Sequence, residues 1–244
     1  VALQAEEKVV FIDTKRRRKA MIVAERKPIK EILAMVADFK KILLVGCKGC
    51  VTVCNAGGTK EVGILASALK IARKKEGNPI EIDEMTLERQ CDPEYIDQLE
   101  EPLKNNNYDA VLSMACSVGP QFIARRYENI LVYPTLNTCF MGGALEHGVW
   151  AEFCQGCGNC IIHHFGGLCP IARCSKSLMN GPCGGSAGGK CEVSPDIDCV
   201  WHLIYERMKQ LGRLDQLREI FPIKDWSTSR DGGPRKIVRE DLKK

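Results

Sequence analysis

Residues 42–46 read "ILLVG", a short continuous apolar run that follows two lysines. Such a run is typical of a strand that is buried on both faces of a parallel sheet. Further short apolar stretches occupy residues 80–85, 109–115 and 130–134. Segments with helical periodicity separate them, and this alternation predicts an α/β fold with a doubly wound, mostly parallel sheet of the Rossmann or flavodoxin-like kind.

The helices expected around these strands have recognisable boundaries. Pro28 suits the first turn of a helix over residues 29–41. Thr59 opens a helix whose apolar residues recur at helical spacing as far as Gly77. Shorter helices are expected over residues 93–106 and 122–127. An amphipathic helix is expected from residue 200, with an apolar face formed by Trp201, Ile204, Tyr205, Met208 and Leu211.

The composition is ordinary except for 14 cysteines in 244 residues. A net charge of +4 and 6% aromatic residues give little support for a nucleic-acid binder. The sequence has no apolar run of membrane-spanning length and no secretion signal, so we expect a cytoplasmic protein without a membrane span. Because cytoplasmic thiols stay reduced, metal ligation or redox chemistry is a better interpretation than a disulfide scaffold.

Cysteines follow every strand expected in the first half of the chain. Cys47, Cys50 and Cys54 come after the first strand, as "CKGCVTVC". Cys91 follows the second strand and Cys116 the third, while Cys139 follows the fourth. Ligands of open parallel sheets sit outside the carboxyl ends of the strands, so these cysteines are expected on the side where a site forms. The pattern favours an iron–sulfur cluster over a thiol–disulfide pair of Cys47 and Cys50. Cys139 is the weakest candidate, because a buried thiol explains it equally well.

Residues 153–199 contain eight cysteines and almost no periodicity, which indicates that metal ligation replaces a hydrophobic core. The run "CQGCGNC" matches the C-x₂-C-x₂-C part of bacterial ferredoxin motifs and favours iron–sulfur over zinc. The remaining five cysteines supply a second four-cysteine site, for which a closed zinc site is a serious competitor. The spacing does not decide how the eight divide between sites.

The stretch "GGSAGGKC" that begins at Gly184 nearly matches a phosphate-binding loop. No strand leads into it, however, and Cys191 stands where the motif requires a hydroxyl. We therefore interpret the glycines as tight turns that bring Cys183 and Cys191 to one metal site. His163 and His164 are expected to lie at the surface or to contact metal ligands, rather than to bind metal themselves.

Four segments follow from these patterns. Residues 1–27 form a charged extension whose run "KRRRK" is read as a solvated surface segment or an arm on a partner. Residues 28–150 form the α/β domain, and residues 151–200 form the cysteine-rich metal-cluster region. Residues 201–244 form the C-terminal helix and an extended arm that packs on a partner.

Several motifs together resemble a known family. They include "ERQCD", "ACSVG", "YPTLNT" and, most specifically, "CPIARCSKSLMNGPCGG". From about Met21 onward the chain resembles the methylenetetrahydrofolate reductase C-terminal domain family, which includes MetV-type subunits of acetogens and other anaerobes. The resemblance implies an iron–sulfur and zinc subunit that passes electrons to or from the flavin of a MetF-like catalytic subunit in the one-carbon (Wood–Ljungdahl) pathway.

The resemblance also implies the ligands and the partners. Two or three [4Fe–4S] clusters are expected, with zinc as the alternative at one cysteine site and no flavin in this chain. A further electron-donor subunit or a ferredoxin is another expected partner. A structural zinc scaffold without electron transfer is the rival function. The candidate cofactor and metal ligands are Cys47, Cys50, Cys54, Cys91, Cys116, Cys154, Cys157, Cys160, Cys169, Cys174, Cys183, Cys191 and Cys199. No catalytic residue is expected.

Overall fold

The computed structural model describes residues 22–146, 148–238 and 241. Among these, Arg26–Leu136 form one compact unit. Residues 22–25, together with those from Asn137 onward, form a second unit. The basic run at residues 15–19 lies outside the described residues. The division into four segments stays a prediction.

The first unit contains a four-stranded parallel sheet in the order β3-β2-β4-β5. Its strands are β2 (Lys41–Cys47), β3 (Glu81–Leu87), β4 (Ala110–Met114) and β5 (Leu131–Pro134). Each of them matches an apolar run in the sequence, and the predicted α/β fold class is confirmed. Residues of β2 and β4 are buried almost throughout, as the continuous apolar runs require.

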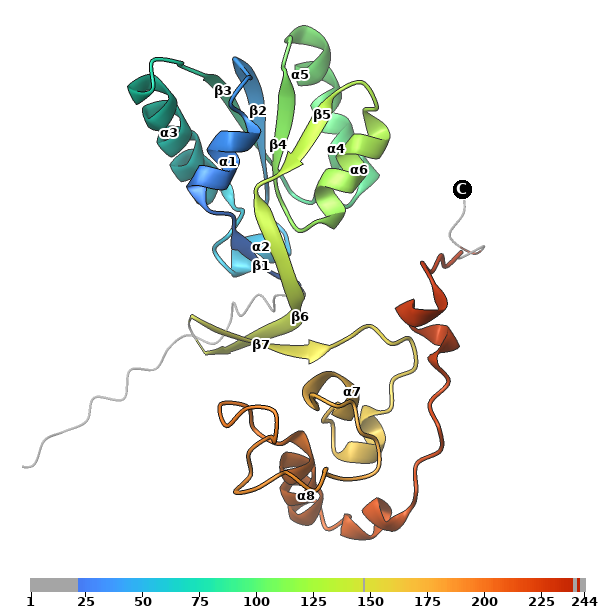
Figure 1. Cartoon of the computed structure of the whole chain (residues 1–244). Helices are drawn as coiled ribbons and strands as arrows, with labels where there is room; N and C mark the ends of the chain where they lie inside the picture. Colours follow the sequence, from blue (N-terminus) through green and yellow to red (C-terminus); the bar gives the residue numbers. More distant parts are fainter. Residues whose placement is uncertain (1–21, 147, 239–240, 242–244) are drawn as a thin grey trace, which may run out of the picture. The chain divides into compact units, whose positions relative to one another are not determined.

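Helices cover both faces of this sheet (Figure 1). On one side lie α1 (Ile29–Met35) and α3 (Thr59–Lys75). On the other side lie α4 (Pro93–Ile96), α5 (Glu100–Asn105) and α6 (Val118–Arg126). Side chains of the second group pack on alternate residues of the strands, including Leu43, Val45 and Val111. The strand order changes direction at β2, so the carboxyl ends of β2 and β4 border the crevice where ligands of such sheets bind.

Three of the expected helices differ in extent. The helix expected over residues 122–127 begins earlier, at Val118, and ends at Arg126. The helix after Pro28 ends at Met35, well before residue 41. The helix expected over residues 93–106 is interrupted by a 3₁₀ turn, Asp97–Leu99, between α4 and α5. Pro102 lies in the first turn of α5, where its missing N–H costs nothing, and this favours a new helix start after the 3₁₀ turn.

The second unit contains a three-stranded sheet in the order β1-β6-β7 that the sequence analysis missed. Its strands are β1 (Ile22–Arg26), β6 (Leu136–Glu146) and β7 (Val149–Cys154). Strands β6 and β7 pair antiparallel with register shifts at Met141/Gly142 and Ala144/Glu146. The irregular pairing and the paired glycines of β6 explain why the segment has no clear strand periodicity.

Beyond β7 the chain is mostly irregular, with short helical turns and one longer helix. A 3₁₀ helix (Ile162–Phe165), α7 (Pro170–Arg173) and α8 (Val200–Gln210) surround a small core. That core contains Phe165, Trp201, Ile204 and Met208. Tyr205 and Leu211 were expected in the apolar face of α8 but are 48% and 43% exposed. The buried stripe of α8 is therefore narrower than predicted, because the unit offers little apolar surface to cover it.

The chain continues after α8 through short 3₁₀ helices, Leu214–Arg218, Trp226–Thr228 and Arg230–Gly232. Lys224 is buried, and its ammonium group donates to the Asn159 carbonyl oxygen at 3.2 Å. The segment is thus anchored on its own unit at this point. Whether it also packs on a partner stays a proposal.

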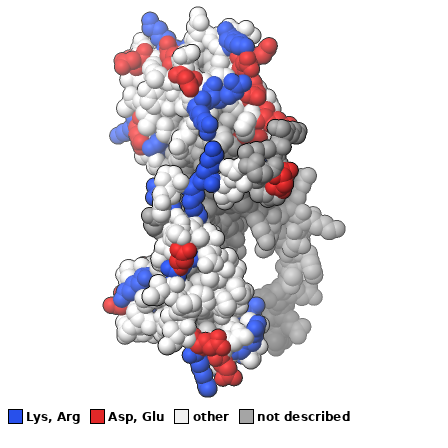
Figure 2. Space-filling model, turned by 90° about the vertical axis from the view of Figure 1, so that its right-hand side faces the viewer, with Lys and Arg blue, Asp and Glu red and all other residues white. Residues whose placement is uncertain are grey.

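The charged surface shows no dominant sign on the face drawn in Figure 2, where blue and red side chains both occur over the α/β unit. None of the described helices is long and apolar enough to span a membrane.

Candidate metal centres

Four cysteines of the first unit come together at the carboxyl ends of the parallel strands. Cys47 is the last residue of β2 and Cys50 is the first residue of α2 (Cys50–Val53). Cys91 follows β3, and Cys116 follows β4. Cys47 interacts electrostatically with Cys91 and Cys116, and Cys91 interacts with Cys50 and Cys116. The fold therefore gathers four thiols that lie up to 69 positions apart in the sequence, from Cys47 to Cys116.

Cys47 is the most buried of these four cysteines. Burial raises the pKa of the Cys47 thiol, and the backbone N–H groups of Gln90 and Gly49 lower it by donating hydrogen bonds to the sulfur. Desolvation raises the pKa of the Cys91 thiol most strongly, and the nearby Cys116 raises that pKa further. Burial thus outweighs the two donors at Cys47. Hydrogen bonds to cysteine sulfurs are among the factors that set the potential of an iron–sulfur cluster.

A glycine allows the loop after α2 to reach this site. A Cβ atom on Gly57 would lie 2.2 Å from the carbonyl oxygen of Met114 in β4. The Gly57 carbonyl oxygen accepts a hydrogen bond of 2.9 Å from the Cys47 N–H. No other residue type could bring this loop so close to both strand ends.

Gln90 positions the Cys91 loop and was missed by the sequence analysis. Its side chain is fully buried, and Nε2 donates to the carbonyl oxygens of Val45 at 2.8 Å and Gly46 at 2.9 Å. These are the two residues that precede Cys47 in β2. Gln90 lies within the "ERQCD" motif, beside Cys91, and that position was the available signal.

Two other cysteines of the N-terminal half lie differently. Cys54 follows α2, and its sulfur donates to the Val51 carbonyl oxygen at 3.5 Å. Cys139 lies in β6 of the second unit, is exposed, and donates to the Asn137 carbonyl oxygen at 3.6 Å. The interpretation of Cys139 as a buried thiol is wrong, because its side chain is exposed on β6.

Four cysteines of the second unit surround one small cavity of about 20 Å³. Cys174, Cys183, Cys191 and Cys199 all contribute to its lining, together with Pro182 and Trp201. The glycine-rich loop makes this possible, because Gly188 and Gly189 adopt positive φ angles of 58° and 77° between Cys183 and Cys191. The loop neither follows a strand nor opens a helix, so it lacks the setting of a phosphate-binding loop.

The surroundings of Cys191 favour a thiolate. The Ser175 hydroxyl lies 3.4 Å from its sulfur. This contact, followed by the backbone N–H of Val193, lowers the pKa of Cys191. Cys183 donates to a carboxylate oxygen of Glu192 at 3.2 Å, and Lys176 forms an ion pair with that carboxylate. One member of the four-cysteine set is thus prepared as an anionic ligand by the protein itself.

The ferredoxin-like triplet begins at Cys154, the last residue of β7, and continues into the irregular segment that follows. Gly156 and Gly158 have positive φ angles of 63° and 82°, and the Gly156 N–H donates to the Cys154 sulfur at 3.3 Å. Cys157 and Cys169 pack against the same hydrophobic core. Cys160 is exposed. Cys169 also accepts a hydrogen bond from the Ala172 N–H at 3.5 Å, at the start of α7.

Across residues 22–146 and 148–238, no three Cys, His, Asp or Glu side chains already have an arrangement that could hold a metal ion. Ligation would therefore require side-chain rotation at each cysteine set. His163 and His164 are exposed and pair with each other, with ring centroids 3.9 Å apart.

Comparison with known proteins adds one finding. Residues 133–227 match the family model described as methylene-tetrahydrofolate reductase C terminal. The match covers less than half of the chain, from the end of β5 through α8, and includes all eight cysteines of the second unit's metal-binding candidates. It relates this part of the protein to methylenetetrahydrofolate reductase. The comparisons gave no match among curated proteins and none among solved structures.

Proposed function

We propose that the protein is the electron-transfer subunit of a heteromeric methylenetetrahydrofolate reductase. The observation that carries this proposal is the convergence of Cys47, Cys50, Cys91 and Cys116 at the carboxyl edge of the parallel sheet. The match of residues 133–227 to the reductase C-terminal family supplies the reaction context. When bound, an iron–sulfur cluster supplies one-electron transfer.

The donor set of the first unit fits a [4Fe–4S] cluster. Such a cluster takes four thiolates, and hydrogen bonds from backbone N–H groups to the sulfurs tune its potential. Cys47 and Cys116 are buried, whereas Cys91 is exposed, so this set has both an enclosed side and an accessible side. Cys54 is the fifth thiol of this region and the alternative ligand. In this proposal Gln90 and Gly57 hold the loops so that the sulfurs face one another.

The donor sets of the second unit fit two different groups. The cavity lined by Cys174, Cys183, Cys191 and Cys199 has room for about one small sphere, which suits a single zinc ion in a closed four-cysteine site. Cys154, Cys157, Cys160 and Cys169 are left for a second cluster. Cys157 and Cys169 pack against a core that Cys174 and Cys199 also contact, so this grouping follows from assigning the other four cysteines to zinc.

The flavin and the folate would bind to a MetF-like partner subunit. A (β/α)₈ barrel needs eight parallel strands and about 250 residues, whereas the described part of this chain has four parallel strands. Single-electron donors, such as a ferredoxin or another subunit, would pass electrons to the groups held by the cysteines of this chain. The flavin in the partner would then use these electrons in two-electron chemistry.

The rival function is a zinc scaffold that stabilises the catalytic subunit and carries no electrons. The size of the four-cysteine cavity favours zinc there but says nothing against clusters at the other two sets. The two functions differ in one observable property, because zinc has no redox chemistry.

The test is direct electron transfer between the two subunits. Protein purified without oxygen is reduced, freed of reductant and mixed with its flavin-containing partner, and flavin absorbance is followed. We expect the flavin to be bleached, and the double variant C47S/C116S to lose most of this transfer. C139S is the matched control and should behave as the parent. A parent protein that binds the partner but never reduces its flavin would establish the scaffold instead.

A further inference from the structure

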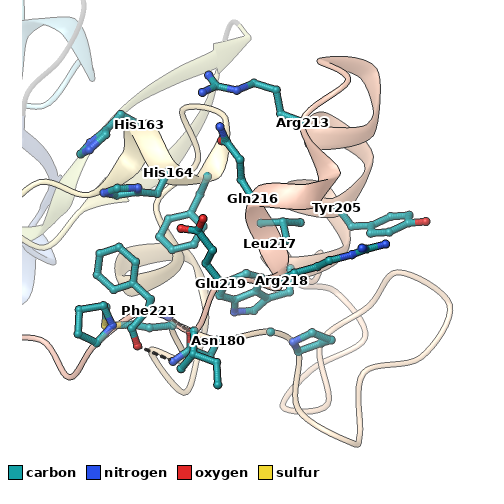
Figure 3. A pocket seen from close by; sticks show the side chains of 17 residues that line it. His163, His164, Asn180, Tyr205, Arg213, Gln216, Leu217, Arg218, Glu219 and Phe221 are labelled. Carbon is teal, nitrogen blue, oxygen red and sulfur yellow. Dashed lines mark hydrogen bonds between the residues drawn. The ribbon is translucent and has the colours of Figure 1, made fainter.

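A pocket of the second unit has no cysteine among its lining residues and belongs to no site described above (Figure 3). Its volume is about 680 Å³, which is within the range of small-molecule sites. Residues 163–165, residues 179–182, α8 and residues 213–222 form its walls. Residues 213–222 are held in place from one side, since Asn180 exchanges two hydrogen bonds with the backbone of Phe221.

One part of the pocket consists of aromatic rings. The His164 ring meets the Phe221 ring edge-on with centroids 5.0 Å apart. Phe165 lies 5.7 Å from Phe221 and 5.4 Å from Trp201, again between centroids. Phe165 and Trp201 are almost fully buried, so their rings are fixed by packing. Such a wall favours a flat ring, because stacking on aromatic side chains stabilises any planar heterocycle.

The opposite part carries hydrogen-bonding groups from a single segment. Figure 3 shows Arg213 and Gln216 along one edge of the pocket, with the carboxylate of Glu219 between Gln216 and Phe221. Neither Arg213 nor Glu219 forms an ion pair within the described residues. A guanidinium group without a carboxylate partner suits a phosphate, and a free carboxylate accepts hydrogen bonds from N–H groups.

We propose that this pocket binds a nucleotide, meaning a flat nitrogen heterocycle with an exocyclic amine and a phosphate group. The ring stacks against His164 and Phe221, and the amine donates to Glu219. Arg213 pairs with the phosphate. Each feature of the ligand has its own partner in the pocket, because the ring faces the aromatic side chains, the amine faces Glu219 and the phosphate faces Arg213. This inference goes beyond the electron-transfer role and does not depend on it.

Trp201 links the pocket to the four-cysteine cavity, because Trp201 and Pro182 line both. A ligand in the pocket would therefore contact the wall of a candidate metal site. It would also change the fluorescence of Trp201, which gives a second way to detect binding.

The test is calorimetric titration of the full-length protein, purified without oxygen, with AMP, GMP, adenosine and inorganic phosphate. We expect at least one of the two nucleotides to bind roughly tenfold or more tightly than adenosine, and phosphate to bind more weakly than either nucleotide. R213Q should reduce nucleotide affinity to about that of the nucleoside and leave adenosine binding unchanged. F221L should weaken nucleotide and nucleoside alike by about tenfold.

The matched control is K209Q, which removes one positive charge from an exposed residue of α8 that does not line the pocket. It should leave every affinity unchanged. The proposal is overturned if neither nucleotide binds more tightly than adenosine, or if R213Q and K209Q have equal effects. Because the comparison of nucleotide with nucleoside uses the parent protein, it holds even if a variant folds poorly.

Discussion

Ser113 donates its hydroxyl to the side-chain oxygen of Gln90 at 2.5 Å, and both side chains are fully buried. Ser113 belongs to β4, whereas Gln90 lies in the loop after β3 and donates to two carbonyl oxygens of β2. One glutamine thus connects three adjacent strands beside the four-cysteine set. The arrangement explains how an irregular loop can hold Cys91 at a defined place.

Gln90→Met should destabilise the first unit by about 3 kcal/mol, because three buried hydrogen bonds are lost and the carbonyl oxygens of Val45 and Gly46 and the hydroxyl of Ser113 each lose a partner. Urea unfolding of the purified protein measures this change. Gln98→Met removes an exposed glutamine and should change the unfolding free energy by less than about 0.5 kcal/mol. Equal effects of the two substitutions would show that Gln90 does not fix the loop.

Arg73 performs a similar structural role at the opposite end of the sheet. Its guanidinium group is buried and donates to the carbonyl oxygens of Val36, Phe39 at 3.0 Å and Asn78 at 2.8 Å. Arg73→Met leaves these carbonyls without their donor and should cost about 3 kcal/mol of unfolding free energy. Lys74→Met, at the exposed neighbour in α3, is the control and should be nearly neutral. A small loss from Arg73→Met would mean that water replaces the guanidinium.

Asn180 is expected to control the mobility of the segment that borders the nucleotide pocket. Asn180→Ala removes two hydrogen bonds, of 2.9 and 2.6 Å, to the Phe221 backbone. Hydrogen exchange of the Phe221 amide should accelerate by roughly fivefold, since about 1 kcal/mol of local protection is lost. Asn180→Asp keeps the acceptor oxygen and should retain most of the protection. Unchanged exchange in Asn180→Ala would show that ring packing alone holds Phe221.

Tyr108 should ionise unusually late. Burial, and then a 2.7 Å hydrogen bond to Asp83, raise the pKa of Tyr108 to about 12. Because the folded state favours the neutral phenol, its contribution to stability is complete below about pH 10 and is lost as the pH rises from about 10 to 12. An ultraviolet titration should show a phenolate component near pH 12 that Tyr108→Phe removes. Tyr205→Phe should leave that component in place, and its persistence in Tyr108→Phe would refute the assignment.

The α/β unit could be predicted from sequence because its strands are buried on both faces. Residues 42–46 are all apolar, and all of them are buried in β2. The predicted helix starts at Pro28 and Thr59 were also confirmed, since proline geometry and helical periodicity act locally. Helix ends were less predictable. Helix α1 ends at Met35, where the sequence has no strong local signal for a helix end.

The second unit was harder to predict, because its strands do not follow simple alternation. Strand β1 is only five residues long, "IVAER", and its pairing with β6 depends on residues more than a hundred positions away. The cysteine motifs identified the candidate ligands but not their neighbours. Ser175 beside Cys191 and Gln90 beside Cys47 are ordinary polar residues whose roles arise only from contacts in the folded chain.

Electron transfer by this subunit requires iron and acid-labile sulfide, so we would measure both, with zinc, on protein purified without oxygen together with any partner that copurifies. We expect about eight irons with matching sulfide and about one zinc per chain, and C174S should lower zinc while leaving iron unchanged. Zinc alone, without iron or sulfide, would contradict electron transfer by this subunit and leave the scaffold as its function.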